Sequence, residues 1–136
     1  MNQSRTSPLP ILVWWIIWGA IFSGVVVIYT FLGRGPSPER EANNMVGFIC
    51  LVPLAFSCVL RWAVMPGQRD RPKALVIFIL GLATAEGSGL IGLLLGGDYR
   101  TAFFALGVVG ILQWIPTFAR RFEQPSSGSA HGLRSP

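Results

Sequence analysis

The sequence predicts an all-α integral membrane protein whose four transmembrane helices form an up-down bundle. Of its 136 residues, 51% are hydrophobic and only 12% are charged, a balance far from that of soluble domains. The hydrophobic residues gather into four runs, each of about 20 residues, the length that crosses a bilayer as a helix. We expect helices because backbone groups in lipid must be satisfied within the segment, and four strands could not close a barrel.

The predicted helices cover about residues 9–32, 42–62, 74–97 and 101–119, and they make one transmembrane domain over residues 1–121. The first run resembles a secretory signal in its position near Arg5. It is longer than the apolar region of a signal and carries Trp14, Trp15 and Trp18, so we expect it to be retained. The second helix follows a connection rich in Gly and Pro over residues 33–41.

The last two helices are predicted to form a tight antiparallel hairpin, because only the short turn at residues 96–100 separates them. Pro116 should loosen the last turns of the fourth helix, near Gln113 and Trp114. Residues 122–136 are rich in Ser, Gly and Pro and are predicted to form a disordered tail.

The distribution of basic residues predicts that both termini are cytoplasmic. With four helices, the N-terminal arm, the connection between the second and third helices and the C-terminal tail share one side. Eight Lys and Arg residues belong to that side, and three belong to the other. The eight are Arg5, Arg61, Arg69, Arg71, Lys73, Arg120, Arg121 and Arg134, and the three are Arg34, Arg40 and Arg100. Because the side richer in Lys and Arg stays in the cytoplasm, this pattern sets the orientation in the cell membrane.

The composition also indicates which partners and chemistries to expect. The net charge of +5 comes from residues that flank helices, which indicates contact with the lipid bilayer and no nucleic-acid partner. Cys50 and Cys58 lie about 12 Å apart along one helix, too far for a disulfide. No metal, cofactor or enzymatic activity is expected, because no ligand cluster and no nucleophile with a nearby His is present in the sequence.

The four apolar runs, Leu9–Leu32, Ala42–Leu60, Ala74–Gly97 and Thr101–Ala119, contain one charged residue, Glu86, which lies near the centre of the third run. An ionised group at the centre of a membrane helix costs about 2.5 to 3.5 kcal/mol. We therefore expect Glu86 either to face the bundle interior or to be protonated, and to be largely neutral at pH 7 unless a cation or water reaches it. It is the candidate ion-binding residue.

Small residues follow the helix beside Glu86. At 100° per residue, Gly81, Ala85, Gly89 and Gly92 form one stripe, which a second helix of this chain, another membrane protein or a second copy could enter. The residues that could support Glu86 in its role are Ala83, Ser88, Gly89 and Ser57.

The second and third helices carry a family resemblance. The loop Gly67-Gln68-Arg69-Asp70-Arg71-Pro72, with Leu80-Gly81-Leu82-Ala83 before Glu86 and Leu90-Ile91-Gly92-Leu93 after it, resembles the hairpin of subunit c, the rotor subunit of F-type ATP synthases. The resemblance covers about a quarter to a third of the chain, and it implies that Glu86 binds and releases a proton or sodium ion. The whole layout is also similar to small uncharacterised four-helix proteins of the bacterial inner membrane.

Two functions follow as hypotheses. The first is a small multi-pass interaction or assembly protein, in which Glu86 is a buried polar contact between helices. The alternative is a proton- or sodium-coupling subunit, in which Glu86 is the titrating group. Transport of a small molecule or lipid binding remains open beside these two.

Overall fold

The computed structural model describes residues 11–33, 35 and 44–122, and these residues form helices and no strand. The predicted N-terminal arm, most of the connection between the first two helices and the tail from residue 123 lie outside the described residues. Four helical spans are long and apolar enough to cross a membrane, and they are Ile11–Leu32, Met45–Gly67, Arg71–Leu95 and Gly97–Phe122. The predicted all-α class and the predicted number of candidate spans are thus confirmed for the described part of the chain.

Two of these spans are continuous helices and two are composite. The continuous ones are α1 (Ile11–Leu32) and α3 (Arg71–Leu95). The second span contains α2 (Asn44–Val59), the π-helical turn η1 (Leu60–Val64) and the 3-10 turn η2 (Met65–Gly67). The fourth contains the 3-10 turn η3 (Gly97–Tyr99), α4 (Arg100–Leu112) and, after a break, the 3-10 helix η4 (Pro116–Phe122).

The second and third spans extend further toward each other than the apolar runs indicated. Helical structure continues beyond residue 62 to Gly67 and begins again at Arg71, three residues before the predicted start. Basic side chains at helix ends are compatible with this, because their long stems let the charged groups reach out of the apolar region. Pro72 also suits the first turn of α3, where its missing N–H would have no helical partner.

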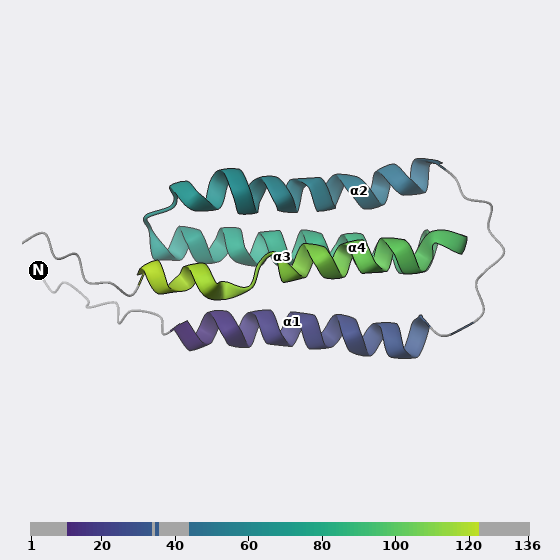
Figure 1. Ribbon diagram of the computed structural model, residues 1–136, viewed down its shortest axis with the longest axis horizontal. Helices are drawn as coiled ribbons and strands as arrows, with labels where there is room; N and C mark the ends of the chain where they lie inside the picture. Colours follow the sequence, from purple (N-terminus) through teal and green to yellow (C-terminus); the bar gives the residue numbers. More distant parts are fainter. Residues whose placement is uncertain (1–10, 34, 36–43, 123–136) are drawn as a thin grey trace, which may run out of the picture.

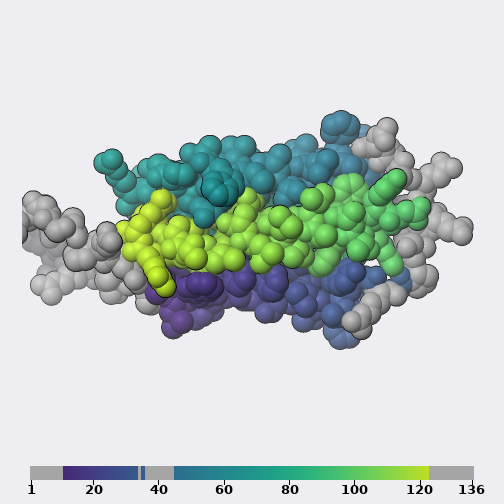
Figure 2. Space-filling model, in the orientation of Figure 1, coloured from purple at the N-terminus to yellow at the C-terminus, as the bar shows by residue number. Residues whose placement is uncertain are grey.

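The four spans pack around a central antiparallel pair. In Figure 1, α1 lies on one side of α3 and α4, and α2 lies on the other. α3 makes extensive contacts with both α4 and α2, whereas only Trp14 and Val25 of α1 are buried. The space-filling view of Figure 2 shows the fourth span, in green to yellow, lying between α1 and α2 along this face of the bundle. α1 and α2 thus each pack against the central pair of α3 and α4.

Glycines bring α3 and α4 into backbone contact. A Cβ atom on Gly107 would overlap the Cα atom of Gly89, and one on Gly92 would overlap the side chain of Phe103. The stripe of Gly81, Ala85, Gly89 and Gly92 predicted from the sequence is buried, and it faces the fourth span. Small residues that let helix backbones approach closely are typical of packing between membrane helices.

The turn between α3 and α4 confirms the predicted hairpin. The N–H of Gly96 donates to the carbonyl of Gly92 at 2.8 Å, which ends α3. Gly97 then adopts a φ of 52°, a backbone conformation that residues with a Cβ atom rarely take. The chain reverses within η3 and enters α4 at Arg100.

An aromatic cluster joins the spans at the end of the bundle where α1 begins. The ring of Trp14 lies 5.0 Å from that of Phe78 and 5.6 Å from that of Phe118. The ring of Phe78 in turn lies 5.9 Å from that of Trp114, and both of these side chains are fully buried. α1 is held at its other end by the stacking of Tyr29 on Phe104, with 4.3 Å between ring centroids.

We expect the α3–α4 contact to be the most sensitive packing position in the protein. Gly107→Val should lower the free energy of unfolding by about 2 kcal/mol or more, because the added atoms overlap backbone that cannot rotate away. Gly87→Val is the matched control, since a Cβ at Gly87 meets nothing within 4 Å. Thermal unfolding in detergent measures both, and equal midpoints for the two variants would contradict the prediction.

Candidate functional site

Glu86 lies on the flank of α3, at the border between its buried and exposed faces. Its side chain is half-buried, whereas Ala85 and Gly89 beside it are buried. Because α3 begins at Arg71 and ends at Leu95, Glu86 lies near its centre and slightly toward its C-terminal end. Within the described residues, no side chain or backbone group forms a hydrogen bond or ion pair with its carboxylate. The bundle thus gives Glu86 partial cover and no polar partner among these residues.

The supporting candidates are not gathered around Glu86. Ser88 lies about 200° around the helix from Glu86, and its Oγ donates to the carbonyl of Cys50 on α2 at 2.5 Å. Ser57 on α2 is buried and donates to the carbonyl of Gly81 at 2.7 Å. Gly89 packs against Gly107, and Ala83 is exposed. Both serines therefore join α2 to α3 on a face away from the carboxylate.

A second group of polar residues forms where the fourth span is broken. Pro116 has no N–H, so the carbonyl of Leu112 cannot receive the usual helical bond and instead accepts one from Ile115 at 3.1 Å. The N–H of Thr117 bonds to Ile115, which leaves the carbonyl of Gln113 without a helical donor. The break thus leaves the carbonyl of Gln113 without a backbone donor inside an apolar span, where it would cost free energy if left unsatisfied.

Side chains from two other helices donate to carbonyls at this break, and one of them satisfies the carbonyl of Gln113. Arg61 Nε, in η1, donates to the Gln113 carbonyl at 2.8 Å. Trp18 Nε1, in α1, donates to the carbonyl of Ile111 at 3.1 Å. The break in the fourth span is therefore bonded to both the first and the second span.

Ser57 connects this break to α3. Trp114 Nε1 donates to Ser57 Oγ at 2.9 Å, and the Ser57 hydroxyl donates in turn to the Gly81 carbonyl at 2.7 Å. The ring of Trp114 occupies the space that a side chain at Gly81 would need. The side-chain oxygen of Gln113 accepts from Trp62 Nε1 at 3.2 Å, which adds a contact with η1. These bonds link the second, third and fourth spans at one level, and we call this set of residues (Ser57, Arg61, Trp62, Gln113 and Trp114) the break network.

Arg61 is surrounded by aromatic rings. Its guanidinium carbon lies 4.7 Å from the ring centroid of Phe118, 5.4 Å from that of Trp62 and 5.8 Å from that of Trp114. The faces of aromatic rings attract cations, so these contacts replace part of the hydration that Arg61 loses. Arg121 shares the ring of Phe118 at 5.9 Å and donates to the carbonyl of Met65 at 2.6 Å.

The sequence indicated only part of this site. Pro116 correctly predicted disruption near Gln113 and Trp114, and Ser57 was named only as a supporting candidate for Glu86. The sequence counts Arg61 among the basic residues at the end of the helix predicted over residues 42–62, whereas the structure places it six residues before the end of the Met45–Gly67 span. Two adjacent pairs in the sequence, Arg61-Trp62 and Gln113-Trp114, are the signal that indicates this site. Each pair combines a polar side chain with an aromatic ring near the end of an apolar run.

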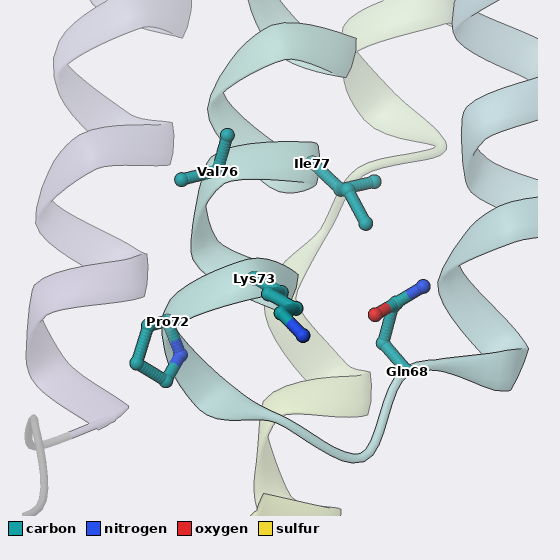
Figure 3. A pocket seen from close by; sticks show the side chains of 5 residues that line it. All are labelled: Gln68, Pro72, Lys73, Val76 and Ile77. Carbon is teal, nitrogen blue, oxygen red and sulfur yellow. The ribbon is translucent and has the colours of Figure 1, made fainter.

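A shallow groove of about 420 Å³ lies at the start of α3. Figure 3 shows Lys73 extending toward Gln68 there, and Pro72, Val76 and Ile77 form the rest of its lining. Lys73 also pairs with the exposed Asp70 at 3.7 Å. The groove is open and mostly apolar, and within the described residues no group of three or more His, Cys, Asp or Glu could hold a metal ion.

No protein-family model, curated protein or solved structure matches this chain.

We expect the break network to contribute measurably to stability through Ser57. Ser57→Ala should lower the free energy of unfolding by about 1 to 2 kcal/mol, because it leaves the buried Trp114 N–H without its acceptor. Ser23→Ala on the exposed side of α1 is the control, and its effect should stay within about 0.5 kcal/mol. Denaturant titration in mixed micelles measures the difference, and a Ser57 variant as stable as the control would refute this role.

Proposed function

We propose that the protein is a multi-pass protein of the cell membrane with both termini in the cytoplasm. The support is the arrangement of charge along the bundle. Among the described residues, Arg61, Arg69, Arg71, Lys73, Arg120 and Arg121 belong to the end where α1 begins, and Arg100 belongs to the other. Contacts of Arg121 with Met65 and of Trp14 with Phe118 bring the start of α1, η2 and η4 to that one end.

The orientation can be tested with reporters at the C-terminus. A fluorescent protein fused after Pro136 should be bright and a periplasmic phosphatase fused there should be inactive, because the basic end is retained in the cytoplasm. Fusion of the same reporters at Asp98, in the turn between α3 and α4, should give the opposite pattern. An active phosphatase at the C-terminus would overturn the orientation.

We infer that the protein serves as an interaction or assembly partner in the membrane, with Glu86 as its polar contact. The observation that carries this proposal is that Glu86 has no hydrogen-bond or ion-pair partner within the described bundle. Ser57 and Ser88, in contrast, are both buried and bonded. A half-buried carboxyl on the flank of a membrane helix gains most from a donor that another helix brings to it.

The proposal predicts a contrast between two substitutions at one position. Glu86→Gln should preserve the associations of the protein because an amide still makes hydrogen bonds, whereas Glu86→Leu should lose them. Crosslinking in intact cells, followed by quantitative mass spectrometry of the purified complexes, measures the contrast. Ala83→Leu is the control, because Ala83 is exposed and lies one turn before Glu86 on the same helix. A Glu86→Leu protein that retains every partner would refute the role of the carboxyl.

The second candidate function is ion coupling, which the same unpaired carboxyl and the resemblance to subunit c favour. For ion coupling, the Glu86→Gln variant gives a second, distinguishing result. Because an amide cannot titrate, this variant should lose ion-coupling activity although its associations with other proteins persist. Carbodiimide reacts with protonated carboxyls, so modification of Glu86 should be blocked by sodium or by high pH. A ring of many copies would support this reading, and a monomer or dimer would contradict it.

A further inference from the structure

Arg61 and Arg121 form a pair of cations that has no acidic partner among the described residues. Both guanidinium groups contact the ring of Phe118, at 4.7 and 5.9 Å from its centroid. Within the described residues the ion pair that forms is that of Lys73 with Asp70, and none involves Arg61 or Arg121. Two positive charges that share one aromatic ring repel each other, and the three rings around the half-buried Arg61 reduce screening by water there, whereas Arg121 is exposed. The site therefore favours a bound anion.

Among the described residues, only one of the three guanidinium nitrogens of Arg61 donates a hydrogen bond to the protein. Nε is used by the Gln113 carbonyl at 2.8 Å, and this bond fixes the plane of the guanidinium. The two terminal nitrogens have no hydrogen-bond acceptor within the described residues. A planar guanidinium held in this way presents its outer edge to an oxyanion, the geometry in which arginine binds phosphate through two parallel hydrogen bonds.

The surface beside Arg61 indicates where that anion comes from. Phe56, Val59 and Trp62 recur at every third residue, and they are 46%, 54% and 69% exposed, which makes an apolar strip along the second span. Trp62 lies at the end of this strip, and its ring centroid is 5.4 Å from the guanidinium carbon of Arg61. A charged group at the end of an exposed apolar strip matches a lipid, whose chains lie along the strip and whose head group reaches the charge.

We propose that Arg61 and Arg121 bind the phosphate group of an anionic membrane lipid at the break in the fourth span. Arg61 donates to the phosphate oxygens from its terminal nitrogens. Arg121 adds positive charge at the edge of the site while one of its own nitrogens holds the Met65 carbonyl. The site is independent of Glu86 and of the activity proposed for it.

The test compares neighbouring arginines that carry the same charge. The full chain in a neutral detergent is titrated with short-chain phosphatidylglycerol, and binding is followed by native mass spectrometry. Arg61→Gln and Arg121→Gln should each weaken binding about tenfold, because each removes a charged donor from the site. Arg69→Gln and Arg120→Gln remove the same charge from exposed positions at this end of the bundle, and they should change binding less than about twofold.

The variants and ligands together keep the proposal falsifiable. If Arg61→Gln unfolds because the Gln113 carbonyl loses its donor, the comparison of Arg121→Gln with Arg120→Gln still decides. Equal losses in those two variants would show binding to net charge alone and overturn the site. Phosphatidylcholine of the same chain length should bind at least about tenfold more weakly. Inorganic phosphate that binds as tightly as phosphatidylglycerol would refute a lipid source.

Discussion

The backbone contact between α3 and α4 is the constraint on which the rest of the bundle depends. Gly89 and Gly107 meet without side chains between them, so the two helices form a narrow central pair. α1 and α2 then pack against the two sides of this pair, as Figure 1 shows. In lipid, apolar side chains gain little from leaving their surroundings, so close packing and hydrogen bonds between helices must supply the stability. The glycine contact provides the first, and it brings the break network close enough to provide the second.

At the break in the fourth span, hydrogen bonds from other helices take the place of helical hydrogen bonds. A proline in a membrane helix leaves carbonyl groups that only another donor can satisfy. Here Arg61, from the second span, donates to the unpaired carbonyl of Gln113, and Trp18, from α1, adds a bond to the carbonyl of Ile111, which also accepts the N–H of Trp114. These bonds form only if the first, second and fourth spans keep their positions along one another. The same requirement brings Arg61 into an apolar span, where a cation without such partners would be costly.

The architecture was predictable because length and hydropathy alone set it. Four apolar runs and a short turn at Gly96 and Gly97 were sufficient for the helices and for the antiparallel hairpin. The stripe beside Glu86 was recognisable from helical periodicity, but periodicity does not say which helix fills it, and the structure assigns it to the fourth span. The position of Arg61 was not predictable, because its charge indicates a polar connection. Its partners, the Gln113 carbonyl and the ring of Phe118, come from a distant segment.

Arg61 and Glu86 are ionisable residues of opposite type inside apolar spans, and the bundle surrounds them differently. Arg61 lies beside Trp114, whose ring meets Gly81, and Glu86 is five residues further along α3, a rise of about 7.5 Å. Helix packing therefore fixes the two charges at different levels, where Arg61 receives a carbonyl and three rings and Glu86 receives no polar contact from the described residues. The cation belongs to the structural framework of the bundle. The carboxyl, in contrast, adds no hydrogen bond or ion pair to that framework among the described residues.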